Sequence, residues 1–361
     1  MKLEILPVLG IGHVSEGDDL AALIATAAPW LRDGDVLVVT SKIVSKAEGR
    51  LVEIPADGPE RQAARDEVLT AETARVVARR GTTRIVQTHH GFVMAAAGID
   101  ASNVDKTRLV LLPKDPDASA RALRAALRER YDRNVAVIVS DTMGRPWRNG
   151  LTDVALGVAG MDAIRDHRGE TDPYGNELTL TEMAVVDELA GAGELIKGKI
   201  DQVPVVVIRG YLGATRDDDG AGAAVLVRDA AQDLFSLGTA EARAAGLAAG
   251  AVLADGPGAE PADPDAVRRA IDAVAQAVAP GTVFTVVDED AYPGLTATVT
   301  GWPSRATRLL LGSPPTPVSA QDLVRFGADL HRLRIALAVE GVPSLALPPP
   351  AASSASAALA V

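Results

Sequence analysis

The chain has 361 residues and a formal net charge of −12, from 36 Lys and Arg against 48 Asp and Glu. This length predicts two domains, and 47% apolar with 23% charged residues is typical of a globular protein with a sizeable core. The acidic balance argues against nucleic acid as a partner. Because the sequence has no Cys, a disulfide, a thiolate nucleophile and a Cys-ligated metal site are excluded.

The N-terminal residues and the hydropathy of the chain indicate its cellular compartment. The first seven residues lack the charged and apolar stretches of a secretory signal. No run reaches the roughly 18 apolar residues that a membrane span needs. We therefore expect a cytoplasmic protein with no membrane partner.

Short apolar runs alternate with amphipathic stretches through the first two thirds of the chain. The runs predict β-strands at 3–8, 35–40, 84–88, 108–112, 135–139 and 204–208. Helices are expected at 18–31, 62–79 and 118–131, the last with Arg121, Arg124 and Arg128 on its exposed face. The pattern predicts an α/β fold of the mixed α+β kind.

The composition changes after residue 245. Residues 246–265 are rich in Gly, Ala and Pro and predict a linker between a domain at 1–245 and a small α/β domain at 266–347. In the second part, helices are expected at 264–279 and 321–340 and a strand at 282–287. The low-complexity end, 348–361, is predicted to be disordered.

The segment 40–50 follows a predicted strand and is a candidate phosphate clamp. It combines hydroxyl groups with Lys42, Lys46 and Arg50, and the sequence has neither of the two commonest Gly-rich phosphate loops. A solvated sheet edge with ordinary surface lysines is the alternative. His13 lies in the Gly-containing stretch 9–14 after the first strand, where backbone amides could approach a ligand.

Two aspartates stand at the ends of apolar runs and are candidate metal ligands. Asp100 and Asp141, with the hydroxyl of Thr142, would supply the oxygen ligands that a hard divalent cation prefers. Helix N-caps are the alternative for both carboxylates.

A cationic loop follows Asp141. Arg145 and Arg148 flank Trp147, and their guanidinium groups could bind the carboxylate or phosphate of an anionic substrate. A structural Arg–Trp stack is the alternative. The turn-rich segment 172–177 and the cations Lys197 and Lys199 are weaker candidates.

Taken together, six segments in matching order resemble the coenzyme F-420: L-glutamate ligase family: 4–8, 33–42, 44–50, 97–104, 140–145 and 172–178. The similarity extends from about residue 3 to about residue 245. It implies an α/β ligase fold that forms an intertwined homodimer. It also implies condensation of L-glutamate with the deazaflavin phospholactate precursor of the coenzyme, driven by hydrolysis of GTP to GDP and phosphate, and extension of the γ-glutamyl tail.

The resemblance assigns roles to the same residues. It implies that GTP is bound by Ile11, Gly12, His13, Val14, Ser41, Lys46 and Asn103, and that the metal ligands are Asp100, Asp141 and Thr142. The cofactors it implies are Mg²⁺ or Mn²⁺, two per subunit, with stimulation by K⁺. We expect Lys46 to steady the phosphates and Arg145 or Arg148 to hold an anionic substrate. Where archaeal members place a further nucleotide and metal loop, residues 211–215 contain no Asp, Glu, His or Cys and show no obvious metal ligand.

The resemblance also bears on the C-terminal part. Actinobacterial members of this two-domain type carry a nitroreductase-like flavin domain there, whereas this chain is much shorter and only 325–344 is similar to a core helix of that domain. We therefore expect 266–347 to be a degenerate nitroreductase-like domain that binds no FMN. Two alternatives are a bifunctional ligase with an FMN-dependent reductase for a dehydro precursor, and a non-catalytic protein that binds GTP or the coenzyme.

Overall fold

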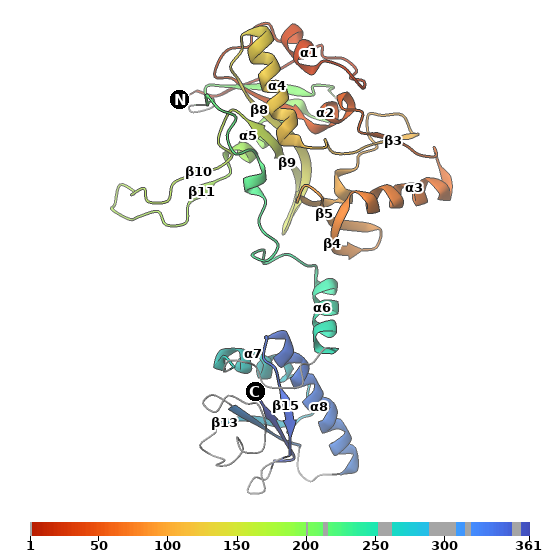
Figure 1. Cartoon of the computed structure of the whole chain (residues 1–361), viewed down its shortest axis with the longest axis vertical. Helices are drawn as coiled ribbons and strands as arrows, with labels where there is room; N and C mark the ends of the chain where they lie inside the picture. The colour runs from red at the N-terminus through yellow and green to blue at the C-terminus, as the bar shows by residue number, and fades with distance from the viewer. Residues whose placement is uncertain are drawn as a thin grey trace. The chain divides into compact units, whose positions relative to one another are not determined.

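The computed structural model describes residues 2–199, 201–211, 216–251, 262–288, 308–314, 319–348 and 355–361. These residues form two compact units, Met1–Gly238 and Thr239–Val361, and each is described by itself (Figure 1). Both units combine helices with sheets, so the prediction of a mixed α+β fold is confirmed. None of the described helices is long and apolar enough to cross a membrane.

A five-stranded sheet forms the centre of the first unit. Its order is β1-β12-β2-β8-β9, and the strands span Glu4–Pro7, Val205–Arg209, Val36–Thr40, Ala136–Arg145 and Arg148–Ala159. Strands β2 and β8 run parallel, with Thr40 opposite Ser140, whereas the other neighbours are antiparallel. The strands predicted at 3–8, 35–40, 135–139 and 204–208 are confirmed, although β8 continues six residues beyond its apolar run.

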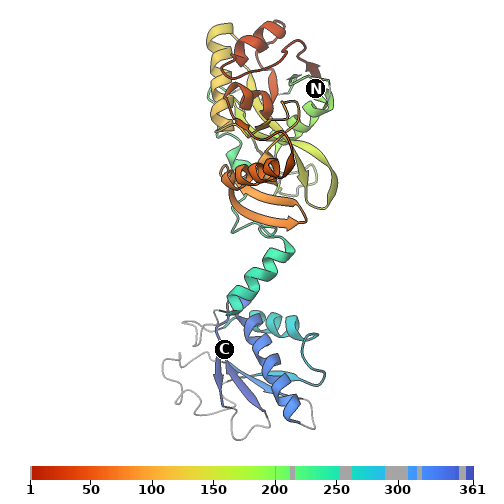
Figure 2. The same cartoon turned by 90° about the vertical axis from the view of Figure 1, so that its right-hand side faces the viewer.

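The centre of this sheet is buried on both faces, which explains why β2, β12 and the first half of β8 are continuous apolar runs. Leu37 and Val39 pack on one face with helices α1 (Leu20–Ala27) and α4 (Pro116–Tyr131). Val36 and Val38 pack on the other face with α5 (Val185–Lys197). Figures 1 and 2 show α4 and α5 on opposite sides of the sheet.

Helix α4 lies directly on β9. A Cβ added at Gly157 would lie 2.1 Å from the carbonyl oxygen of Pro116, so the glycine allows this approach. One expectation for the helix is wrong: Arg124 is buried rather than exposed. Its guanidinium donates to the carbonyl of Val135 and pairs with Asp219 at 2.6 Å, and these bonds offset the cost of burying the charge.

The segment between β2 and α4 forms a smaller layer. It contains α2 (Ser41–Ala47), α3 (Gly58–Ala71) and two small sheets, β3-β7 (Leu51–Glu53, Arg108–Val110) and β4-β5-β6 (Thr73–Arg80, Thr83–Thr88, Val93–Ala95), the last followed by the 3₁₀ turn Ala96–Gly98. The strands predicted at 84–88 and 108–112 are confirmed. The helix predicted at 62–79 is wrong in its second half. Residues from Thr73 onward pair with β5, because the β-branched Val76 and Val77 suit a strand.

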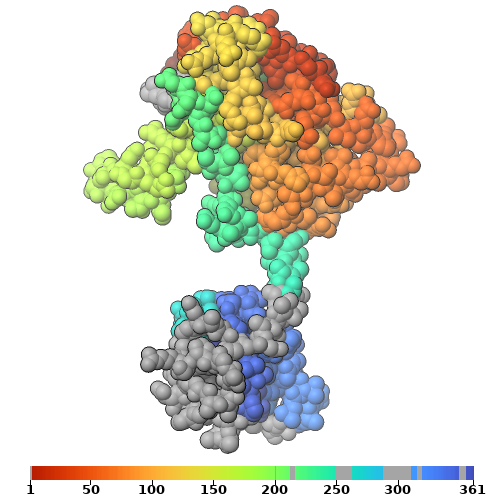
Figure 3. All heavy atoms as spheres, viewed as in Figure 1, coloured from red at the N-terminus to blue at the C-terminus, as the bar shows by residue number. Residues whose placement is uncertain are grey.

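A long segment, residues 160–184, connects β9 to α5 and extends away from the sheet. It is held at its base by β10 (Arg165–Asp166) and β11 (Glu182–Met183), and Figure 3 shows it standing out from the surface of the first unit. The segment 172–177 is the turn that its composition predicts. There, the Asp172 carboxylate accepts from the N–H groups of Tyr174 and Asn176. After β12, the described part of the unit includes the 3₁₀ turn Ala224–Leu226 and continues to Gly238.

The second unit has its own core. Helices α6 (Thr239–Ala251), α7 (Pro264–Val274) and α8 (Ala320–Val339) accompany an antiparallel sheet of order β13-β14-β16-β15, whose strands span Val283–Asp288, Arg308–Ser313, Ala357–Ala360 and Leu345–Leu347. Leu310, Leu333 and Leu359 are buried at its centre. The elements predicted at 264–279, 282–287 and 321–340 are confirmed. Of the expected linker 246–265, residues 246–251 lie in α6, 264–265 lie in α7, and 252–261 lie outside the described residues.

The expectation of disorder is wrong for the end of the chain. Residues 357–360 form β16, which pairs with β14 on one side and β15 on the other. Leu359 in this strand is fully buried. The Ala-rich composition resembles a low-complexity tail, but small residues also fit a central strand under helices. Residues 349–354 of the predicted tail lie outside the described residues.

Candidate functional site

A cavity of about 890 Å³ in the first unit brings together segments that are far apart in the sequence. We call it the cleft. It lies where the parallel strands β2 and β8 end or leave the core, the place where open α/β sheets bind ligands. Eight of the ten residues expected to bind GTP or metal line it: Gly12, His13, Val14, Lys46, Asp100, Asn103, Asp141 and Thr142.

Four residues expected to bind GTP or an anionic substrate do not line the cleft. Ile11 and Ser41 are buried, each with 5% of its surface exposed, and pack inside the unit. Arg145 and Arg148 are exposed at the turn of the β8–β9 hairpin. Trp147 between them packs edge-on against Phe235, with ring centroids 4.4 Å apart, and no arginine stacks on it among the described residues.

Helix α2 places two lysines in the cleft, one turn apart on the same face. Lys46 is buried, and its Nζ donates to the carbonyl oxygen of Asn103 at 2.9 Å. Burial, with the neighbouring charge of Lys42, lowers the pKa of Lys46 below its ordinary value. This ammonium has shed much of its water, so an anion in the cleft would gain a strong partner.

Lys42 pairs with Asp100 across the wall of the cleft. Lys42 Nζ lies 2.6 Å from Asp100 Oδ2 and 2.7 Å from Ser102 Oγ. Burial alone would raise the pKa of Asp100, but the hydrogen bonds from Lys42 and Ser102 outweigh it and lower the pKa. Asp100 caps no helix: its backbone forms an isolated bridge with Val110, and its Oδ1 accepts from the N–H of Ser102.

Asp141 lies within β8 and also caps no helix. Its carboxylate accepts from the N–H of Thr142, and it forms no ion pair with the described residues. Burial, helped by repulsion from Asp153 and Asp100, raises the pKa of Asp141 to about 6. The site therefore holds a carboxylate whose charge would be stabilised by a cation.

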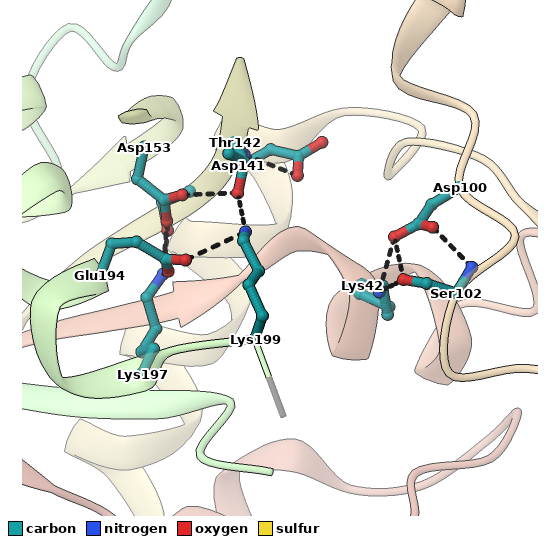
Figure 4. A network of polar contacts seen from close by, with 10 residues as sticks. Lys42, Asp100, Ser102, Asp141, Thr142, Asp153, Glu194, Lys197 and Lys199 are labelled. Carbon is teal, nitrogen blue, oxygen red and sulfur yellow. Dashed lines mark hydrogen bonds and ion pairs between the residues drawn. The ribbon is translucent and has the colours of Figure 1, made fainter. Parts of the chain in front are cut away.

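A buried polar network adjoins Asp141 on the other side from Lys42 (Figure 4). Asp153, on β9 opposite Thr142, accepts from the hydroxyls of Ser140 and Thr142 and pairs with Lys197 at 2.6 Å. Lys199 donates to the Thr142 hydroxyl. Glu194 pairs with both lysines, at 3.5 Å from Lys197 and 3.0 Å from Lys199.

The chemistry of these donors fits a hard divalent cation. Asp100, Asp141 and Thr142 present oxygen atoms to one cleft, and the Asp141 carboxylate there has no cationic partner among the described residues. No group of three His, Cys, Asp or Glu side chains converges on one point within the described ranges. Two carboxylates suit Mg²⁺ or Mn²⁺ bound together with a nucleotide, since Mg²⁺ usually keeps waters and phosphate oxygens among its ligands.

Comparison with known proteins decides the family. A sequence model described as F420-0:Gamma-glutamyl ligase matches residues 9–210, which is more than half of the chain. The chain belongs to this family. The matched range holds every residue of the cleft, and membership in the F420-0:gamma-glutamyl ligase family makes the first unit a ligase domain.

Individual relatives agree with the family match. The coenzyme F420:L-glutamate ligase of Methanothermobacter thermautotrophicus is 42% identical over 252 residues, which cover 65% of this chain and 99% of the relative. The ligase of the same name from Methanopyrus kandleri is 39% identical over 246 residues, 64% of this chain and 97% of the relative. That from Natronomonas pharaonis is 42% identical over 236 residues, 61% of this chain and 90% of the relative.

Five residues of the site were weak candidates or none from the sequence alone. The sequence indicates Lys197 and Lys199 only as weak cationic candidates, and it does not single out Asp153, Glu194 or Ser102. Ser140 and Thr142 alternate on one face of a strand, which signals a polar patch. Asp153 carries no local signal, because its partnership depends on the β8–β9 register. The loop 212–215, where a further metal ligand was sought, lies outside the described residues.

Proposed function

We propose that this member of the F420-0:gamma-glutamyl ligase family joins L-glutamate to a deazaflavin phospholactate precursor of coenzyme F420 at the expense of GTP, and extends the γ-glutamyl tail. One observation carries the proposal. Lysines, candidate metal carboxylates and a Gly-containing loop, drawn from separate parts of the chain, line a single cleft. The names of the relatives support the choice of glutamate and of the coenzyme.

GTP is proposed to bind along the loop 12–14 and the α2 face of the cleft. Gly12, with a φ of 73°, adopts a backbone conformation that favours glycine and leaves no side chain between the loop and a ligand. Lys46 would contact the phosphates, and Lys42 lies one turn away. Met94, Ile99 and Met143 form an apolar part of the lining that suits a planar ring of guanine or deazaflavin.

Asp100, Asp141 and Thr142 are proposed to hold Mg²⁺ or Mn²⁺, in two sites. When bound, such ions would neutralise the negative charge that develops on the phosphates during transfer. The chain's own cations, Lys42 and Lys46, would orient the phosphates beside the carboxylates.

The reaction proceeds in two balanced steps. The terminal carboxylate of the precursor attacks the γ-phosphorus of GTP, the bond to the β-phosphate oxygen breaks, and an acyl phosphate and GDP form. The glutamate amine then attacks the acyl carbon, phosphate leaves, the nitrogen loses a proton, and an amide remains. Lys46 would stabilise the charged phosphate oxygens in both steps. Arg145 and Arg148 are proposed to hold an anionic part of a substrate.

Two features of the proposal rest on the family resemblance: a homodimer as the working form, and stimulation by K⁺. We also propose that the second unit binds no FMN. The family match ends at residue 210 and does not reach that unit. Purified protein without a flavin absorbance band is the expected result, and a yellow protein with stoichiometric FMN would favour the bifunctional enzyme.

The proposed function is tested by incubating the purified full chain with GTP, Mn²⁺, L-glutamate and the glutamate-free deazaflavin precursor. Products are followed by mass spectrometry, with ATP in place of GTP as the matched control. Mass steps of one glutamate residue that require GTP are expected. Tight binding of GTP with no product would contradict the ligase and favour a binding protein.

A further inference from the structure

The hydroxyl of Thr142 is held with a defined hydrogen-bond polarity. A hydroxyl has one proton, and Thr142 Oγ1 donates it to Asp153 Oδ1 at 2.8 Å. On the cleft side, the same oxygen accepts from the ammonium of Lys199. Thr142 therefore presents lone pairs, and not its proton, to the cleft, and a positive group already occupies that position (Figure 4).

Asp153 can act only as an acceptor in this arrangement because its surroundings are donors. Its Oδ2 accepts from Lys197 at 2.6 Å and from the Ser140 hydroxyl at 2.9 Å. Lys197 also donates to Ser140 Oγ at 2.7 Å, so the Ser140 proton must go to Asp153. The side chains of Asp153 and Lys197 are 2% and 4% exposed, which keeps water from competing for these bonds.

We propose that Asp153, fixed by Lys197 and Ser140, is a positioning residue that turns the lone pairs of Thr142 toward a cation bound in the cleft. The inference rests on the proposed function insofar as that function places a divalent cation at Thr142. It assigns a task to the ion pair of Asp153 and Lys197, of which Lys197 lines the cleft and Asp153 lies behind Thr142. Groups behind a metal ligand commonly set its orientation, and losing one lowers metal affinity about 10- to 100-fold.

Stability alone does not explain this pair. A buried ion pair is often replaceable by apolar side chains of similar volume without loss of stability. What an apolar pair would not supply is the acceptor for the Thr142 proton. Without it, that proton is free to point into the cleft, where it would repel a cation.

The position of the acceptor predicts an unusual result for Asp153→Asn. The ammonium of Lys197 can only donate at this short distance, so the amide introduced at position 153 would turn its oxygen toward Lys197 and its NH₂ group toward Thr142. Thr142 would then accept from the amide and direct its own proton into the cleft. When Lys197 is also replaced by Met, no ammonium faces position 153, and the amide oxygen can turn back to accept from Thr142.

Two double variants of the full chain form the test: Asp153→Asn/Lys197→Met and Asp153→Leu/Lys197→Met. Both variants remove one negative and one positive charge. Because Asn and Leu have similar shapes, the two variants differ mainly in whether position 153 carries a hydrogen-bond acceptor. The probe is Mn²⁺ in the presence of GDP, which excludes turnover. Free Mn²⁺ is measured by electron paramagnetic resonance, and folding by circular dichroism and the thermal midpoint.

We expect the Asn/Met variant to bind Mn²⁺ nearly as tightly as wild type, and the Leu/Met variant to bind it about 10- to 100-fold more weakly. The single variant Asp153→Asn should bind Mn²⁺ as weakly as Asp153→Leu/Lys197→Met does. Adding Lys197→Met to Asp153→Asn should restore the affinity. Equal Mn²⁺ affinity of the two folded double variants would overturn the inference. A wild-type protein that binds Mn²⁺ but adds no glutamate would instead overturn the proposed function, and it would leave the comparison of variants intact.

Discussion

Lys42 and Asp100 form an ion pair at the wall of the cleft, with 2.6 Å between Nζ and Oδ2. The lysine comes from a short helix after β2 and the aspartate from a loop 58 positions later in the chain, beside β7. One candidate metal ligand is therefore already satisfied by a cation of the protein. A divalent ion that binds Asp100 competes with this ammonium for the carboxylate, and a displaced ammonium is free to contact a phosphate.

The first prediction concerns that exchange. Lys42→Met should tighten the binding of Mn²⁺ alone and weaken the binding of GTP. A partly exposed ion pair is worth up to about 1 kcal/mol, which corresponds to about fivefold in affinity. Isothermal titration with each ligand separately measures both effects. Lys2→Met is the control, because Lys2 pairs with Glu4 outside the cleft; weaker Mn²⁺ binding by Lys42→Met would contradict the exchange.

The second prediction concerns Asp141 and pH. The pKa of Asp141 is raised to about 6 from an ordinary value of 3.8, so the folded protein holds this proton where the unfolded chain has lost it. Stability should therefore fall as pH rises from about 4 to about 6, by up to about 3 kcal/mol. Asp141→Asn removes the titrating group and should be more stable than wild type above about pH 6 in a chelator.

Denaturant unfolding at several pH values measures this difference between wild type and Asp141→Asn. Asp57→Asn, which removes an exposed carboxylate outside the cleft, is the matched control. Parallel pH profiles for wild type and Asp141→Asn would show that Asp141 is not destabilised by its surroundings.

The third prediction concerns Lys46. Lys46→Met should weaken GTP binding about 10- to 100-fold, because a hydrogen bond to a charged group is worth about 1.5–3 kcal/mol and each 1.4 kcal/mol is tenfold in affinity. The measurement is the Kd for GTP at fixed Mn²⁺. Lys106→Met changes an exposed lysine outside the cleft and should bind GTP normally. An unchanged Kd for Lys46→Met would remove Lys46 from the nucleotide site.

The fourth prediction concerns the β8–β9 hairpin. Arg145 and Arg148 are exposed and do not line the cleft, so Arg145→Ala and Arg148→Ala should leave the Kd for GTP unchanged. If either guanidinium holds an anionic part of the precursor, the KM for that substrate rises in the same variants. Steady-state kinetics with the precursor varied at saturating GTP separates the two effects. A normal KM in both variants would end the assignment of these arginines to the substrate.

Local sequence patterns predict much of the central sheet and about half of the residues of the site. The apolar runs of β2 and β8 are buried on both faces, so they stand out in the sequence. Asp100 and Asp141 are recognisable because polar residues at the ends of such runs are the usual place for ligands. The alternative, that both carboxylates are helix N-caps, is wrong, because neither residue precedes a helix.

The remaining features depend on contacts that no local pattern encodes. Lys197 reaches Asp153 from 44 positions away, through the packing of α5 on the sheet. Arg124 is buried because Asp219, also distant in the chain, lies within reach of it. The Ala-rich strand β16 resembles a disordered tail until β14 and β15 pair with it.

A GTP-dependent ligase must couple the release of GDP to the addition of glutamate. Purified wild-type protein is supplied with the deazaflavin precursor, L-glutamate and Mn²⁺, and GDP release and glutamate addition are counted in the same samples. We expect one GDP for each glutamate added, with both reactions lost together in Asp141→Asn. Glutamate addition without GDP release, or full activity of Asp141→Asn, would contradict this expectation.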